Sequence, residues 1–114
     1  MSAKIDYVIS SDWNDGFVLE VFVTDTTSET IDSPVVHMEI PENISDLWNG
    51  NKIQTSDGYD VEGINAGSVL EPNEQWRFSF KVDGDDHTLP TVTDVQGEVD
   101  GQLLILGVNT DQTQ

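Results

Sequence analysis

Hydrophobic and polar residues alternate along many short segments of this chain. Phe17, Leu19 and Val21 fall on one face of such a segment, and the residues between them fall on the other. This period of two predicts β-strands with one face in a core, and clusters of Gly, Pro, Asn and Asp mark the turns between them. The expected strands cover residues 5–9, 17–24, 35–40, 44–48, 52–54, 59–62, 68–70, 75–82, 91–96 and 102–108.

Short strands separated by turns at intervals of about eight to twelve residues, with no segment of helical period, predict a single all-β domain. We expect an antiparallel β-sandwich of about nine strands with immunoglobulin-like or jelly-roll-like packing. The domain should cover residues 1–109, and the polar residues 110–114 should form a frayed tail. In the strand at 75–82, Trp76 shares one face with Phe78 and Phe80, so Trp76 belongs in the core.

Trp13 and Trp48 stand in a different setting. Trp13 lies in the sequence Ser-Asp-Trp-Asn-Asp-Gly-Phe and Trp48 in Ser-Asp-Leu-Trp-Asn-Gly-Asn. Asp, Asn and Gly favour turns at the surface, so we expect both indoles to be exposed to water. A flat apolar ring can stack on the C–H face of a sugar while the sugar hydroxyls remain hydrated. The pair therefore indicates polysaccharide binding. A Trp13 folded over the rim of a loop, or a Trp48 buried under its own turn, is the alternative.

The charge of the chain restricts its partners. Twenty-two acidic and four basic residues give the 114 residues a net charge of −18. Binding to nucleic acid or to an anionic membrane surface draws on Lys and Arg, so this charge argues against both, whereas a neutral glycan is compatible with it. Such acidity favours solubility, and scarce Lys with abundant Asp, Thr and Val also resembles proteins from saline, halophilic environments. No stretch approaches the ~18 apolar residues of a membrane span.

The chain carries no pattern typical of catalysis. It has no Cys, hence no disulfide, zinc thiolate or thiol nucleophile. His37 falls within an expected strand and His87 in a loop, and neither a Ser-His-Asp spacing nor a glycine-rich phosphate loop is present. A glycosidase needs two carboxylates in a cleft, but the number of acidic residues makes some pair inevitable and therefore uninformative. We expect neither enzymatic activity nor a cofactor.

One loop has the composition of a calcium site. Asp83, Asp85 and Asp86 surround Gly84, which permits a sharp bend. Ca²⁺ takes about six to eight oxygen ligands, and carboxylate-rich loops supply them. The loop lacks the spacing of an EF-hand and its terminal Glu, so a plain β-turn is the favoured interpretation and calcium is the alternative.

Several motifs occur in an order and spacing typical of one known family. The most specific is Trp-Asn-Asp-Gly-Phe at 13–17, which is similar to a Trp-Asn-x-Gly-Phe motif. Gln-Trp-Arg-Phe at 75–78 is similar to a Gln-Phe-Gly-Phe strand, and Val-Gln-Gly at 95–97 to a closing Asn-Gly strand. Further matching positions, all between residues 4 and 100, are Ile5, Tyr7, 21–24, Trp48, 64–67 and 70–72. Through these segments the chain resembles family 2 of the carbohydrate-binding modules, which includes cellulose- and chitin-binding domains.

The resemblance implies a sandwich with a flat face of aromatic rings that binds sugar. Trp13 and Trp48 match two of the family's three platform tryptophans, and Ile64 stands where the third would be. Gly16 matches the small residue of the type that binds crystalline polymer, whereas a bulky Arg at that position is found in the xylan-binding type.

The resemblance also concerns polar residues around this face. Lys4 and Asp100 stand near the positions of the family's disulfide, so an ion pair could replace it. Turn or edge amides can hydrogen-bond to sugar hydroxyls, although turn chemistry explains them equally well. The candidates of this kind are Asn14, Asn49, Asn65 and Gln54.

We therefore expect a non-catalytic module that binds cellulose, chitin or a related neutral polysaccharide and holds the catalytic domain of a parent enzyme against it. We expect a secreted, extracellular protein. Residues 1–4 run directly into an expected strand with no signal peptide before it, so a native export signal could have been removed. The alternative is a structural or protein-interaction β-sandwich, with or without stabilising calcium, that does not bind sugar.

Overall fold

Strands make up almost the whole of the chain. The fold is seen in a computed structural model, in which residues 2–84 and 88–112 are described. The strands are β1 (Ser2–Trp13), β2 (Gly16–Asp25), β3 (Ile31–Glu39), β4 (Asn43–Trp48), β5 (Gly50–Gln54), β6 (Gly58–Gly63), β7 (Val69–Leu70), β8 (Gln75–Asp83), β9 (Thr91–Val99) and β10 (Gln102–Gln112). A short 3-10 turn, η1 (Asn65–Ser68), precedes β7. The prediction of an all-β domain is confirmed.

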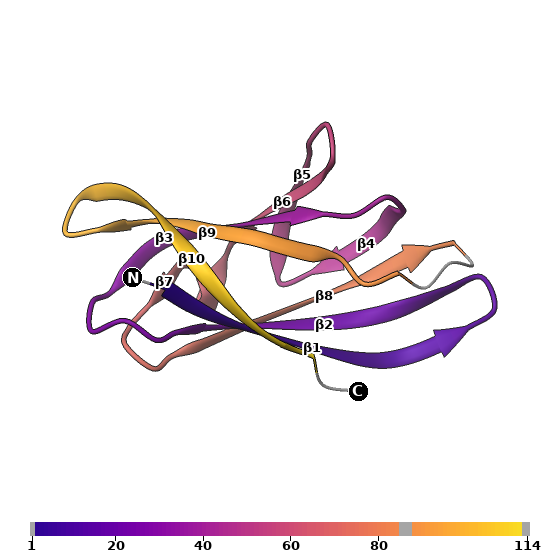
Figure 1. The fold of residues 1–114 in the computed structure, drawn as a ribbon, viewed down its shortest axis with the longest axis horizontal. Helices are drawn as coiled ribbons and strands as arrows, with labels where there is room; N and C mark the ends of the chain where they lie inside the picture. The colour runs from indigo at the N-terminus through magenta and orange to yellow at the C-terminus, as the bar shows by residue number, and fades with distance from the viewer. Residues whose placement is uncertain (1, 85–87, 113–114) are drawn as a thin grey trace.

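The strands form two layers that face each other (Figure 1). One layer, the β1 sheet, contains β4, β8, β2 and β1 in that order, and the other, the β9 sheet, contains β9, β3, β6 and β5. Strand β10 links the layers, because residues 102–106 pair with β9 and residues 107–112 pair with β1. The β1–β10 pair is parallel, whereas the other pairs among the described residues are antiparallel. The fold differs from the expected antiparallel sandwich at this one junction.

The two ends of the strand order meet at Asn49. Strand β4 ends directly before this residue and β5 begins directly after it, so the turn at Asn49 and Gly50 joins the two layers and does not close a hairpin. Asn49 has a φ of 66°, in the left-handed region that Asn tolerates. Its carbonyl accepts a hydrogen bond from the Trp76 indole at 2.9 Å, and its side chain donates to the Arg77 carbonyl. These two bonds hold the turn against β8.

The core lies between the inward faces of the two sheets. Phe17 and Leu19 of β2 are buried, as their alternation with polar residues predicts. Trp76 of β8 is 1% exposed, and its ring centroid lies 4.9 Å from that of Phe78, which in turn stacks on Phe80 at 6.1 Å. The prediction that Trp76 belongs to the core is confirmed.

Strand β10 is longer than its sequence pattern predicts. It continues to Gln112, opposite Tyr7 of β1, and therefore includes residues 110–112 of the segment that was expected to fray. The polar residues at this end of the chain are held by backbone pairing with the first strand. A local pattern of hydrophobicity does not reveal a partner strand so distant in the sequence.

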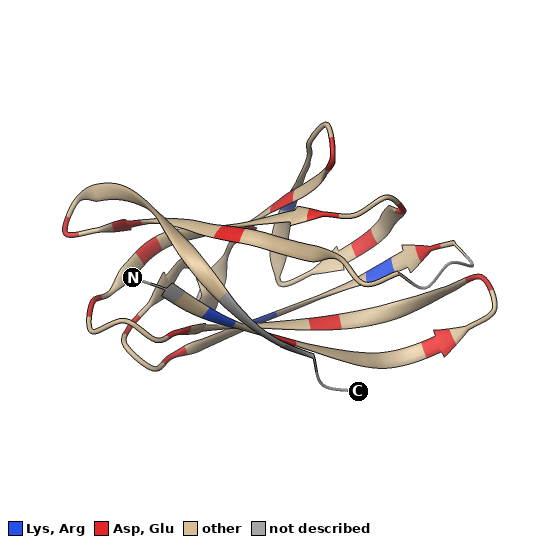
Figure 2. Ribbon diagram, in the orientation of Figure 1, with Lys and Arg blue, Asp and Glu red and all other residues tan. Residues whose placement is uncertain are grey.

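Acidic residues are spread over turns and strands of both sheets, and the few basic residues lie among them (Figure 2). Within the described residues, the buried charged side chain is Asp25, whose carboxylate accepts hydrogen bonds from the backbone N–H and the hydroxyl of Thr27. The described residues also contain no helix long and apolar enough to cross a membrane.

Candidate functional site

Trp13 lies on the outer face of the β1 sheet, over Gly16. Because Phe17 faces inward, its neighbour Gly16 faces outward, and the register of the β1–β2 hairpin places Trp13 opposite it. A Cβ atom built on Gly16 would stand 3.2 Å from Cζ2 of the Trp13 ring. The indole is 39% exposed, and Nζ of Lys81 lies 5.7 Å from its centroid. The ring therefore lies along the sheet surface, beside a cation from β8.

Trp48 is exposed on the same sheet. It ends β4 opposite Ser79 of β8, and Ser79 faces outward because its neighbours Phe78 and Phe80 are buried. The Trp48 side chain is 49% exposed. The prediction that Trp13 and Trp48 are exposed to water is confirmed.

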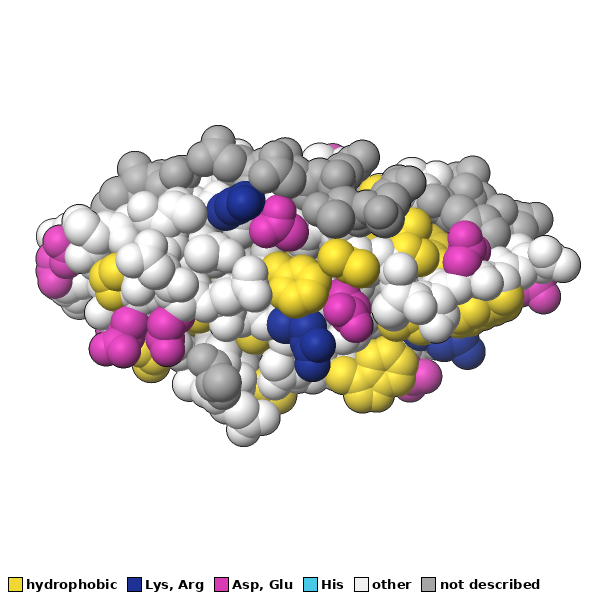
Figure 3. Space-filling view, turned by 90° about the horizontal axis from the view of Figure 1, so that it is seen from below, with side chains coloured by type: hydrophobic (Ala, Val, Ile, Leu, Met, Phe, Trp, Pro, Cys, Tyr) yellow, Lys and Arg dark blue, Asp and Glu magenta, His cyan; other side chains and the backbone are white. Residues whose placement is uncertain are grey.

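The two indoles are separate contact points and not a stacked pair. Trp48 lies opposite Ser79, and Trp13 lies opposite Gly16, which pairs with Asp83. Strand rise and strand spacing put the Cα atoms of the two residues on the order of 20 Å apart. Glu20 and other outward polar side chains lie between them, and Figure 3 shows hydrophobic, basic and acidic side chains interspersed on this side of the molecule.

The four candidate amides do not form one group. Asn14 lies in the tight turn beside Trp13, and Asn49 follows Trp48 but uses its side chain to bind backbone. Asn65 begins η1 with a φ of 53°, and its carbonyl accepts a hydrogen bond from Ser68. Gln54 is exposed at the far end of β5 from Trp48. Of the four, Asn14 and Asn49 adjoin the exposed indoles.

Ile64 lies at the same end of the sandwich as Trp48. It follows Gly63, which pairs with Gly50, two residues after Trp48. The side chain is 37% exposed and lines a hollow of about 480 Å³ with Pro34 and other residues of β3, β5 and β6. Ile64 therefore lies near the Trp48 end of the sandwich, and its contact with a ligand stays a prediction.

The expected ion pair between Lys4 and Asp100 is replaced by a different arrangement. Lys4 lies opposite Asn109, and its Nζ is 3.9 Å from Oδ2 of Asp6. Asp100 lies in the turn between β9 and β10, with a φ of 53°. Much of the length of β10 separates this turn from Asn109, so the chain brings Lys4 to a carboxylate of its own strand.

The calcium hypothesis falls largely outside the described residues. Asp83 ends β8 on the surface, whereas Asp85 and Asp86 are not among the residues that the structure describes. Within the described part of the chain, no group of three or more His, Asp or Glu side chains is arranged to hold a metal ion.

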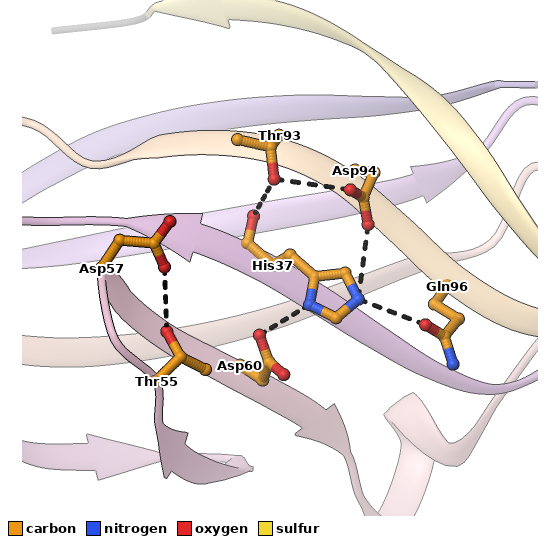
Figure 4. A network of polar contacts seen from close by, with 7 residues as sticks. All are labelled: His37, Thr55, Asp57, Asp60, Thr93, Asp94 and Gln96. Carbon is orange, nitrogen blue, oxygen red and sulfur yellow. Dashed lines mark hydrogen bonds and ion pairs between the residues drawn. The ribbon is translucent and has the colours of Figure 1, made fainter.

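His37 lies at the centre of a polar network. Its position within an expected strand did not predict this network. Nδ1 of His37 donates to Oδ1 of Asp60 on β6 at 2.6 Å (Figure 4). Nε2 lies 3.3 Å from Oδ1 of Asp94 and 3.4 Å from Oε1 of Gln96, both on β9. The ring thus connects three adjacent strands on the outer face of the β9 sheet. Its partners are distant in the sequence, so no local signal could have revealed them.

The acidic partners change the protonation of His37. Partial burial of the ring lowers its pKa, but the hydrogen bond and the charge of Asp60, together with the charge of Asp94, outweigh this effect. The pKa of His37 therefore lies above its ordinary value of 6.5. With both ring nitrogens facing acceptors, the protonated form of the ring is favoured more than in a free imidazole.

An all-β sandwich that exposes two tryptophans on the outer face of one sheet has the architecture of a carbohydrate-binding module. The chain belongs to the cellulose-binding domain family, CBM_2, whose sequence profile matches residues 3–99. This is a family of non-catalytic binding domains.

Two relatives come from Cellvibrio japonicus. The chain is 26% identical to Endoglucanase C over 81 residues and 26% identical to Endo-1,4-beta-xylanase A over 82 residues. These matches cover 70% and 71% of the chain but only 11% and 13% of the relatives. The chain therefore spans a small part of the length of these enzymes.

Two solved structures share the fold. A GH20 exo-β-N-acetylglucosaminidase from Vibrio harveyi matches with a TM-score of 0.82 at 15% identity, over 97% of this chain and 18% of that one. The chitin-binding domain of Chi18aC from Streptomyces coelicolor matches with a TM-score of 0.65 at 20% identity, over 88% of this chain and 91% of that domain. At these identities the likeness supports the fold alone.

Proposed function

We propose that this domain binds a neutral β-1,4-linked polysaccharide, cellulose or chitin, through Trp13 and Trp48. In this role it catalyses no reaction and holds a secreted parent enzyme against the polymer. The observation that carries the proposal is the exposure of these two indoles on one sheet, in a chain that buries its third tryptophan. Family membership supports a sugar ligand. The chain matches only a small part of two much longer enzymes, which supports attachment to an enzyme.

The distance between the indoles favours a polymer over a small sugar. Two contact points whose Cα atoms are on the order of 20 Å apart on one sheet face can be bridged by an extended chain of several sugars, but not by a monosaccharide. Lys81 and Glu20 face outward on the same sheet and can exchange hydrogen bonds with sugar hydroxyls.

The expected affinity is modest. If each indole loses about 100 Å² of apolar surface on binding, each contributes about 2.5 kcal/mol before the costs of association. The stacking of two rings and a few hydrogen bonds to sugar hydroxyls then predict a Kd of about tens of micromolar or weaker. A polymer compensates by offering many overlapping sites.

The test is a sedimentation assay with insoluble cellulose, chitin and xylan. Trp13→Ala and Trp48→Ala should each weaken binding at least about tenfold, with nearly unchanged melting curves, because both side chains are exposed. Ile53→Ala is the matched control, since Ile53 is 46% exposed on β5 of the other sheet and should not affect binding.

The outcomes separate this function from its alternative. If the wild-type domain sediments with none of the three polymers, a structural or protein-interaction sandwich is the better description. If it binds but tolerates both Trp→Ala changes, the polymer is held elsewhere and the proposed site is wrong.

A further inference from the structure

Strand β10 has an unusual distribution of hydrophobic side chains. Leu106 is buried and Leu104 packs against the core, as expected for one face of a strand. Leu103 and Ile105 point the other way and are 64% and 71% exposed, the highest values among the large hydrophobic side chains of the described residues. A strand that is apolar on both faces is typical of a position covered on both sides. Here the outer side is open.

The same segment also presents an open backbone edge. Residues 102–106 pair on one side with β9. The pairing with β1 begins only where Ser2 lies opposite Gly107, so in the described part of the chain no strand lies against the other side of residues 102–106. Open edges are usually protected by charged side chains or Pro, and this segment has neither.

Carboxylates lie beside the exposed apolar residues on the side of β9. Leu103 lies opposite Glu98, and Ile105 lies opposite Gln96 on β9. Ile105 also forms one wall of a hollow of about 330 Å³ over His37. The acidic residues that line this hollow are Glu39, Asp57, Asp60 and Asp94. The surface therefore combines an apolar centre with an acidic border on one side, and we call Leu103, Ile105, Glu98 and the acidic residues of this hollow the β10 surface.

We propose that the β10 surface docks a protein surface with an apolar centre and a border of Lys or Arg. Burial of Leu103 and Ile105 would drive the contact, and cations on the partner would face the carboxylates of Glu98 and Asp94. This proposal does not depend on sugar binding, because the indoles of Trp13 and Trp48 lie on the opposite sheet. The domain can therefore hold a polymer and a protein at the same time.

Charge disfavours a second copy of the chain as the occupant. Two copies related by a two-fold axis would bring the same acidic border against itself, and each copy carries a net charge of −18. A polysaccharide is also a poor occupant, because the branched side chains of Leu and Ile present no flat ring for a sugar face. A basic protein surface satisfies both the apolar and the acidic parts.

The experiment uses the full chain and two labelled probe peptides. One peptide alternates Lys with Leu, and the other alternates Lys with Ser at the same length and charge. Fluorescence anisotropy at physiological salt should give an affinity at least about tenfold higher for the Lys-Leu peptide, a preference that charge alone cannot produce. The double variant Leu103→Ser/Ile105→Ser should abolish this preference.

Matched variants distinguish binding at the β10 surface from non-specific binding to any exposed apolar side chain. Val69→Ser and Ile53→Ser also remove exposed apolar side chains without changing charge, and should keep the preference. Equal binding of the two peptides, or a preference that survives Leu103→Ser/Ile105→Ser, overturns the proposal. A dimer of the free chain in sedimentation equilibrium that the double variant dissociates would also overturn it, in favour of self-association. The double variant should still sediment with polysaccharide as the wild type does, so this result is independent of the proposed function.

Discussion

The indole of Trp13 lies across Gly16, and the two residues fit because position 16 has no side chain. A Cβ atom there would stand 3.2 Å from Cζ2 and 3.3 Å from Nε1 of the indole. It would also overlap the carbonyl oxygen of Val82 on the neighbouring strand. Glycine therefore permits both the flat position of the ring and the close pairing of β2 with β8.

Gly16→Ala should accordingly affect both stability and binding. The added methyl group has to displace the Trp13 ring and part of β8, and overpacking of this kind typically costs about 1–3 kcal/mol. We expect a lower melting temperature in calorimetry and several-fold weaker sedimentation with crystalline polymer. Gly107→Ala is the control, because nothing lies within 4 Å of a Cβ atom at that position. Wild-type melting and binding by Gly16→Ala would show that the ring does not depend on this glycine.

Trp76→Ala should unfold the domain more easily without selectively affecting the ligand site. Loss of a buried aromatic residue typically costs about 3–5 kcal/mol, and this change also removes the hydrogen bond from the indole to the Asn49 carbonyl. Urea unfolding should show the loss. Trp48→Ala is the matched control, with a nearly unchanged unfolding midpoint. Equal destabilisation by the two variants would contradict the assignment of one indole to the core and the other to the surface.

The His37 network should make stability depend on pH. The folded-state pKa lies above 6.5, so the folded protein binds this proton more tightly than the unfolded chain. The stabilisation is complete below about pH 6.5 and is lost as the pH rises through the folded-state pKa. Wild type should therefore exceed His37→Gln in unfolding free energy at about pH 6, and the difference should shrink towards about pH 9.

Titration by NMR provides a direct check on this network. The ring protons of His37 should report a midpoint above 6.5 in the wild type, and Asp60→Asn should move that midpoint down, since it removes the closest carboxylate. The groups that face the ring are Asp60, Asp94 and Gln96. A wild-type midpoint at or below 6.5 would mean that burial, and not the carboxylates, determines the charge of the ring.

Salt should stabilise the folded state. With four basic and twenty-two acidic residues, like charges lie within a Debye length of about 10 Å at 0.1 M salt, and folding brings them closer together. The melting temperature should rise between roughly 10 mM and 1 M NaCl, while sedimentation with a neutral polymer changes little. A melting temperature independent of salt would show that the carboxylates are spaced too widely to repel one another.

Calcium can be distinguished from ionic strength in the same experiment. Millimolar Ca²⁺ should raise the melting temperature beyond a NaCl solution of matched ionic strength only if residues 83–86 form a binding loop. Asp83→Asn, with Glu98→Asn as a control for lost charge, assigns any extra effect. An equal response of both variants would locate the calcium effect outside this loop.

Ile64→Trp tests the third platform position implied by the family. A ring at this position would tighten binding to crystalline polymer if the loop before η1 contacts the ligand. Ile64 lines a hollow with Pro34 and follows Gly63, which pairs with Gly50, so the ring would stand near the Trp48 end of the sandwich. Unchanged affinity, with an unchanged melting curve, would restrict the ligand face to the β1 sheet.

Local sequence signals predicted the parts of the fold that depend on single strands. Alternation placed Phe17 and Trp76 in the core, and the Asn-Gly and Asp-rich settings placed Trp13 and Trp48 at the surface. These signals depend on which face of a single strand is buried. The alternation of neighbouring residues along that strand shows this. The sequence therefore sufficed for the presence of the strands and for the exposed indoles, but not for the full length of β1 and β10.

Features that depend on two distant segments were not predictable in this way. The Lys4–Asp100 pair was expected by analogy with a disulfide, but the parallel register puts Asn109 opposite Lys4. His37 was placed on a strand face, whereas its carboxylate partners depend on which strands adjoin β3. Register between strands is a property of the whole fold, and a single sequence does not display it.

The parallel pairing of β1 with β10 also determines when the domain can fold. These are its first and last strands, so a loop of about the full chain length must close before they meet, and contacts of such large sequence separation slow folding. During synthesis the β1 sheet and the β9 sheet can each begin to form, but their junction must wait until the last strand has left the ribosome. Until then, the edges of β1 and β9 remain open to other chains. The net charge of −18 opposes aggregation of the chain during this time.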